Sequence, residues 1–152
     1  MKVEESSFAF PRRRKKKTQL LSVLSIVTVA MTPDLDPQIS RERMRKIIEA
    51  TKRDHPDIRL ILFGETILGW FYKNDETREY HESIAEAVPG PSTAFIAALA
   101  KRHDIYISFG LSERADDKLY NSQVLISPDG NVIAKHQNSG FETRCLLQEI
   151  GN

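Results

Sequence analysis

A glutamate follows one of the most apolar stretches of this 152-residue chain. Residues 60–72 read LILFGETILGWFY, so four apolar side chains lead directly into Gly64 and Glu65. A carboxylate at the end of a buried strand is costly unless it is paired, hydrogen-bonded or solvated. Either the strand end opens into solvent, or the carboxylate is held there for acid–base chemistry. Glu65 is therefore the first candidate catalytic residue.

A second group of residues has the side-chain types of metal ligands. The segment KNDETREYHES, residues 73–83, carries Glu76, Glu79, His81 and Glu82. A metal site needs ligands that converge at compatible distances, and a polar loop with charged neighbours contains the same mixture by chance. We therefore interpret this segment as a solvated loop and expect no metal site.

The only cysteine of the chain is Cys145. A single cysteine excludes a disulfide within the chain, which agrees with a reducing compartment, and we expect a cytoplasmic protein. A lone cysteine in the sequence TRCLLQEI is more typical of a small apolar residue than of a nucleophile.

Composition indicates one globular domain, with 40% apolar and 28% charged residues. The net charge is +1, but residues 11–17, PRRRKKK, contain six of the 22 basic side chains. The remaining 16 basic and 21 acidic residues give the body of the protein a charge of −5. The basic character is thus local.

The N-terminal region has two interpretations. Six cations followed by TQLLSVLSIVTVAM resemble a secretory signal, but a small-residue cleavage pattern is not clear. The apolar part is also shorter than the roughly 20 residues that a bilayer requires, so we expect no membrane span. We favour a buried first strand within Leu20–Met31. Residues 1–17 are then a disordered extension, and since no groove-reading motif accompanies the basic run, we expect no nucleic-acid partner.

The elements that would position Glu65 alternate between helices and strands. Asp36 and Pro37 predict the start of a helix. Its buried stripe has a spacing of i, i+3, i+4 and i+7 and consists of Met44, Ile47, Ile48 and Thr51. A strand follows at Ile58–Phe63, and its consecutive apolar residues predict cover on both faces.

The second half of the pattern begins with a polar segment, residues 71–91, which we expect to be largely an irregular loop. A second helix follows Pro91, with Phe95, Ala98 and Leu99 on its inner face. A third strand at Asp104–Phe109 leads to a hairpin with the turn SerProAspGly. The order β-α-β-α-β-β-β predicts an α/β layered domain.

In this order the segments resemble the carbon-nitrogen hydrolases of the nitrilase superfamily. The likeness is carried by LILFGETILGWFY, by VPGPSTAFIAALAKRHDIYISFGLSER and by DDKLYNSQVLISPDGNVIAKH. With the first strand and helix it covers residues 20 to 137, which is the N-terminal half of a family domain. The resemblance implies a partial α-β-β-α sandwich, in a family whose members commonly pair into larger assemblies, so a complete chain would be a homo-oligomer.

The resemblance also implies a chemistry. Family members use a Glu-Lys-Cys triad on small-molecule amides, nitriles or carbamoyl compounds, without a metal or organic cofactor. The cysteine thiolate attacks carbon to form an acyl-enzyme, the glutamate is the general base, and the lysine stabilises the tetrahedral intermediate. Glu65 matches the glutamate. Gly64 departs mildly from the pattern, because many members have proline there.

The other two triad positions do not match. The family lysine is the second lysine of a pattern like Gly-Lys-Tyr-Arg-Lys, and the corresponding run here is AKHQN. Lys135 thus matches the first, structural lysine, and the uncharged Asn138 stands at the catalytic position. Lys135 could replace it only after a shift of three residues, which we do not expect. The family cysteine lies several tens of residues beyond the lysine, so Cys145 does not match it.

These comparisons divide the chain into a basic extension, residues 1–17, a family half-domain, residues 18–137, and a divergent tail, residues 138–152. We expect a truncated chain with little or no activity alone, or a non-catalytic partner of a full-length relative. Half of a two-sheet sandwich leaves an apolar sheet face exposed, so we also expect poor solubility or dependence on a partner.

Overall fold

The computed structural model describes residues 24–69 and 77–138, and the structural findings concern these residues. The basic run at residues 11–17, the first residues of the expected N-terminal strand, Glu76 and Cys145 lie outside them. The expectations that depend on those positions therefore stay predictions.

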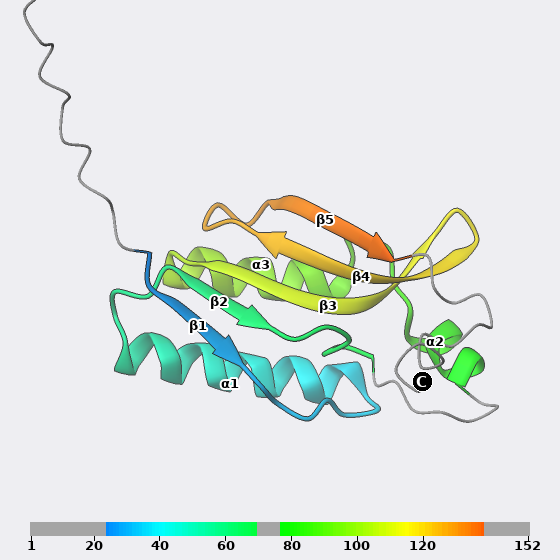
Figure 1. Ribbon diagram of the computed structural model, residues 1–152, viewed down its shortest axis with the longest axis horizontal. Helices are drawn as coiled ribbons and strands as arrows, with labels where there is room; N and C mark the ends of the chain where they lie inside the picture. The colour runs from blue at the N-terminus through cyan, green and yellow to red at the C-terminus, as the bar shows by residue number, and fades with distance from the viewer. Residues whose placement is uncertain (1–23, 70–76, 139–152) are drawn as a thin grey trace, which may run out of the picture.

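Five strands form one sheet in the order β1-β2-β3-β4-β5 (Figure 1). They are β1 (Ile26–Val29), β2 (Leu60–Phe63), β3 (Tyr106–Ala115), β4 (Lys118–Ile126) and β5 (Val132–Asn138). Strands β1, β2 and β3 are parallel to one another, and β4 is antiparallel to both of its neighbours, β3 and β5. The helices are α1 (Pro37–Asp54), α2 (Thr77–Ile84) and α3 (Pro91–His103). This confirms the expected α/β class and order, with α2 as an addition.

Helix α1 begins where the sequence predicts. The Asp36 side chain accepts a hydrogen bond from the Gln38 backbone nitrogen at 2.8 Å, and Pro37 occupies the first turn. Met44 and Ile48 are fully buried, as the stripe predicts. Helix α3 also forms, but Ile96, Leu99 and Ala100 are its buried apolar residues, whereas Ala98 is exposed. The expected inner face is therefore confirmed at Leu99 and at Phe95, which packs against the core, but it is wrong at Ala98.

Helix α2 corrects the expectation of an irregular loop for residues 77–84. Only one side chain of α2, His81, is fully buried. The segment therefore lacks the apolar stripe by which a helix is recognised in a sequence. The His81 Nδ1 atom lies 2.7 Å from Ser112 Oγ of β3, and Arg78 and Glu82 form an ion pair at i, i+4. In the part of the chain that the structure describes, no group of acidic, histidine or cysteine side chains is arranged to hold a metal ion.

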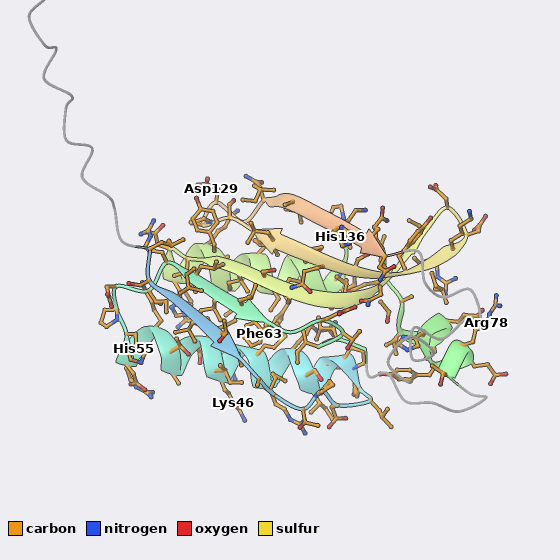
Figure 2. All side chains as sticks on the ribbon, viewed as in Figure 1. Lys46, His55, Phe63, Arg78, Asp129 and His136 are labelled. Atoms are coloured by element: carbon orange, nitrogen blue, oxygen red, sulfur yellow. The ribbon has the colours of Figure 1, made fainter. Side chains whose placement is uncertain are left out.

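The two faces of the sheet differ in cover. Helices α1 and α3 lie together on one side, here called the helix face, and α2 lies beyond one end of the strands (Figure 1). Ile61 and Phe63 of β2 belong to the core beneath the helices, and Figure 2 shows Phe63 between the sheet and α1. Leu62 points to the opposite, open face and is 38% exposed. The expectation that β2 is covered on both faces is therefore wrong for the described residues.

The antiparallel strands are joined by two tight turns. In the β4–β5 turn Gly130 has a φ of 77°, and its backbone nitrogen donates to the Ser127 carbonyl at 2.8 Å, as the SerProAspGly sequence predicts. The β3–β4 turn uses Asp116 and Asp117, both at positive φ. Strand β3 therefore extends well past Phe109, where the sequence prediction ended it. No helix within the described ranges is long and apolar enough to cross a bilayer.

Candidate active site

Glu65 lies in a tight turn that directly follows β2. The Gly110 backbone nitrogen of β3 donates to the Gly64 carbonyl at 3.3 Å, and the Leu68 nitrogen donates to the Gly110 carbonyl at 3.1 Å. Thr66 has a left-handed φ of 57°, a conformation that only a fixed environment maintains in a β-branched residue. The turn is thus fastened across β3 and holds Glu65 at the carboxyl end of a parallel strand, where α/β proteins commonly bind ligands.

A pocket of about 290 Å³ opens beside Glu65. Its other lining residues come from β4 and β5 and are Asn121, Gln123, His136 and Asn138. Asn121 pairs with Asn138, and Gln123 pairs with His136, in the β4–β5 register. The hairpin therefore presents two adjacent rows of polar side chains to the glutamate on the open face of the sheet; His136 is labelled in Figure 2.

Two carboxamides organise this pocket. The Asn121 Nδ2 group donates a hydrogen bond to Glu65 Oε1, which orients the carboxylate. Gln123 Nε2 donates to Ser108 Oγ at 2.9 Å and to the Phe63 carbonyl at 3.3 Å, so it supports the end of β2 immediately before Glu65. The Asn121 Oδ1 atom is buried and has no hydrogen-bond partner among the described residues. The accessible acceptor of the pocket is therefore the Glu65 carboxylate.

The two residues weighed for the lysine role lie on different faces. Asn138 lines the pocket with Glu65. Lys135 pairs with Val124 in the register and places Nζ 2.6 Å from Glu113 Oε1 on the helix face. Among the residues that the structure describes, no lysine or arginine lines this pocket, and Asn138 contributes a neutral amide. The pocket can therefore accept a proton and donate hydrogen bonds, but its lining carries no permanent positive charge for an oxyanion.

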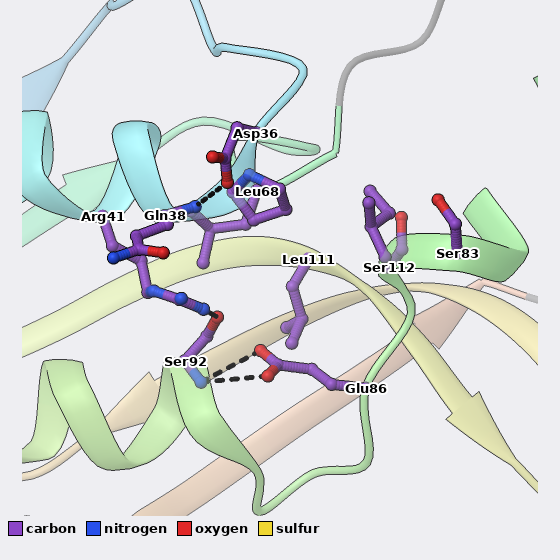
Figure 3. A pocket seen from close by; sticks show the side chains of 11 residues that line it. Asp36, Gln38, Arg41, Leu68, Ser83, Glu86, Ser92, Leu111 and Ser112 are labelled. Carbon is purple, nitrogen blue, oxygen red and sulfur yellow. Dashed lines mark hydrogen bonds between the residues drawn. The ribbon is translucent and has the colours of Figure 1, made fainter. Parts of the chain in front are cut away.

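A second pocket, of about 220 Å³, lies where the N-terminal ends of α1 and α3 meet β3 (Figure 3). Its charged groups have structural partners. The Glu86 carboxylate accepts from the Ser92 backbone nitrogen at 3.1 and 3.0 Å, which caps α3, and Arg41 Nη1 donates to Ser92 Oγ at 2.9 Å. These contacts join the two helices, and we assign no chemistry to this pocket.

Sequence reasoning found Glu65 and Asn138 but missed the other pocket residues. Asn121, Gln123 and His136 could have been found from the alternation of β4 and β5, because residues on one face of paired strands recur at every second position. Asn121 is also the middle residue of the Tyr-Asn-Ser step.

Known proteins match this chain over most of its described length. The sequence model of the family described as Carbon-nitrogen hydrolase matches residues 25–143. The omega-amidase NIT3 of Saccharomyces cerevisiae is 30% identical over 105 residues, which is 67% of this chain and 36% of that protein. A formamidase of Bacillus cereus is 33% identical over 115 residues, 74% of this chain and 33% of that protein.

A solved structure, that of a carbon-nitrogen hydrolase from Helicobacter pylori, superimposes with a TM-score of 0.60 at 20% identity. The superposition covers 76% of this chain and 39% of that one. The chain thus spans about a third of the length of the curated relatives that it matches.

Proposed function

The chain belongs to the carbon-nitrogen hydrolase family, and from this premise we propose that it provides the glutamate-bearing part of a site that hydrolyses C–N bonds outside peptides. The substrates of that site are linear amides, nitriles or carbamoyl compounds. The observation that carries the proposal is the position of Glu65 after β2, in a polar pocket where Asn121 orients its carboxylate. Relatives named as amidases support the substrate class.

In this proposal Glu65 is the general base. It removes the proton from the cysteine that attacks the substrate, and later from the water that releases the acyl group. Asn121 keeps the carboxylate turned toward the pocket. The nucleophile comes from outside the described residues, and Cys145 is not assigned to that role.

Asn138 limits what this chain does alone. A neutral amide stabilises an oxyanion less than an ammonium group, and the loss of one oxyanion donor typically costs about 100- to 1000-fold in rate. We therefore propose that the chain alone has little or no turnover. An assay of the purified chain with short amides and carbamoyl amino acids tests this, with Glu65→Ala and Cys145→Ser as controls. Turnover that Cys145→Ser abolishes would contradict the proposal.

A chimera tests the role of Glu65 directly. Residues 24–138 would replace the matching segment of the Bacillus cereus formamidase, in parent and Asn138→Lys forms, and hydrolysis of that enzyme's substrate would be measured. We expect the Asn138→Lys chimera to be at least about 100-fold faster than the parent chimera. Glu65→Gln should abolish its activity. If Glu65→Gln leaves the Asn138→Lys chimera fully active, Glu65 is not the general base.

A second candidate function is a non-catalytic partner of a full-length relative. It is favoured by the exposure of aliphatic side chains on the open face, since Ile26 is 49% and Leu62 is 38% exposed. Co-expression with a full-length relative tests it. Co-purification as a stable complex supports this function, and a monodisperse monomer that does not bind the relative contradicts it. Cytoplasmic location and assembly into homo-oligomers stay predictions.

A further inference from the structure

A buried carboxylate lies on the helix face of the same strands that line the Glu65 pocket. Glu113 of β3 is 1% exposed. Its Oε2 accepts from Ser122 Oγ of β4 at 2.5 Å and from Gln137 Nε2 of β5 at 3.1 Å, and its Oε1 accepts from Lys135 Nζ at 2.6 Å. One side chain therefore connects three neighbouring strands.

This arrangement is strongly constrained by the cost of burying charge. An isolated carboxylate in a protein interior is unfavourable, and it is tolerated when each oxygen is hydrogen-bonded and an opposite charge is close. Lys135 supplies the charge, and Ser122 and Gln137 supply the remaining donors. Displacing β5 along β4 would separate Glu113 from two of its three donors.

The partners of Glu113 alternate with the residues that line the pocket. Lys135 and Gln137 precede His136 and Asn138, respectively, and Ser122 lies between Asn121 and Gln123. Successive side chains of a strand point to opposite faces, and a slip of one residue exchanges the two faces. Contacts that hold Lys135 and Gln137 on the helix face therefore hold His136 and Asn138 on the pocket face.

Strand β5 has a particular need for such a restraint. It is the last strand of the sheet order, so within the described part of the chain it is paired on one side only. The β4–β5 register is also irregular between Leu125 and Ile126, close to the start of β5. Backbone pairing with β4 alone gives an edge strand limited resistance to slippage.

We propose that Glu113 is the positioning residue of the Glu65 pocket. It acts through Lys135 and Gln137 to fix the side and register at which β5 presents His136 and Asn138 beside Glu65. The inference concerns the site of the proposed function, but it depends only on the geometry of the pocket. A test that measures this geometry without hydrolysis therefore separates a failure of this inference from a failure of the proposed function.

Side-chain NMR of the full chain tests the inference. In Glu113→Gln, we expect the side-chain amide resonances of Asn138 and the imidazole resonances of His136 to shift or broaden in the folded protein. These groups lie on the opposite face of the sheet from the substitution, so a direct local effect is small. Ile48→Val is the matched control, because it weakens the core under α1 without touching β5 and should leave those resonances in place.

A conservative pair of variants covers the case in which Glu113→Gln does not fold. Glu113→Asp keeps the charge but shortens the reach to Lys135, and it should displace the same resonances. Adding Lys135→Arg, a longer cation, should return the Asn138 resonances toward their parent positions. If Glu113→Asp, or a folded Glu113→Gln, lowers stability as Ile48→Val does but leaves Asn138 and His136 unchanged, Glu113 is only structural and the inference is wrong. Failure of Lys135→Arg to reverse the displacement also overturns it.

Discussion

Gly110 of β3 lies directly against the backbone of Glu65. A Cβ atom at Gly110 would lie 2.9 Å from the Glu65 Cα atom and 2.5 Å from the Thr66 backbone nitrogen. Both distances are shorter than any relaxed contact, and the opposing atoms belong to the main chain, which cannot turn away as a long side chain does. The absence of a side chain at position 110 therefore allows the turn that carries the candidate catalytic carboxylate to lie across β3.

Substitution of this glycine should displace Glu65. We expect Gly110→Ala to lower the free energy of unfolding by about 1–3 kcal/mol, the usual cost of overpacking, and to weaken the Asn121–Glu65 hydrogen bond. Urea denaturation measures the first effect, and the Asn121 side-chain amide resonances report the second. Gly64→Ala is the matched control, because nothing lies within 4 Å of a Cβ at that position. Equal effects of the two substitutions would show that the close approach at Gly110 has no consequence.

Substitution by threonine should affect stability very differently at two adjacent residues of β2, Leu62 and Ile61. Leu62 is 38% exposed on the open face, and Ile61 is fully buried under the helices. Leu62→Thr should reduce self-association with little loss of stability, because it removes apolar surface from water and introduces a β-branched residue, a type that strands favour. Ile61→Thr should destabilise the fold by about 2–4 kcal/mol, since it buries a hydroxyl and removes packing.

Light scattering and urea denaturation on both variants check this prediction. If Leu62→Thr leaves scattering unchanged, the open face does not drive self-association. Such a result would also remove the support that this face gives to a partner-binding function.

The residues that could be predicted from the sequence share a local signal. Asp36 and Pro37 identify the start of α1, the SerProAspGly turn identifies the β4–β5 hairpin, and the apolar run before Glu65 identifies the strand that carries it. Each depends on neighbours in the sequence and on the conformations that these residue types prefer.

The parts that were missed depend on contacts between distant segments. The helix at α2 is stabilised by His81 packing on Ser112, 31 residues away, which no local pattern indicates. The consecutive apolar residues of β2 do not reveal whether one face or both are covered. The residues that line the pocket are brought together by the pairing of β4 with β5. The role of Glu113 is evident only from its contact with Lys135, which the sequence does not indicate.

The carboxylate of Glu86 should stabilise the start of α3. It accepts from the Ser92 backbone nitrogen with both oxygens, at a helix end where unpaired N–H groups favour negative charge. We expect Glu86→Gln to lower the free energy of unfolding by about 1 kcal/mol in urea denaturation at low ionic strength. Glu79→Gln, at an exposed glutamate of α2, should change it by less than about 0.5 kcal/mol. A Glu86→Gln protein as stable as the parent would rule out this capping role.

The burial of His81 should make the fold sensitive to mild acid. Burial lowers the pKa of His81 from its ordinary value of 6.5 to about 4, so the folded protein holds a neutral imidazole against Ser112. Between these two pH values the unfolded chain binds more protons than the folded chain. The contribution of His81 to the free energy of unfolding is therefore fully present above pH 6.5 and is lost as the pH is lowered toward 4. The loss from this residue is at most about 3 kcal/mol.

Urea denaturation of the parent and of His81→Gln at a series of pH values between 7 and 4.5 measures this dependence. Glutamine does not titrate and can keep a hydrogen bond with Ser112, so the variant should lose less stability over the upper part of the range. All other titratable groups are the same in both proteins, so their contributions cancel in the comparison. Parallel stability curves for the two proteins between pH 6.5 and 5 would mean that His81 takes up its proton as readily in the folded chain as in the unfolded one.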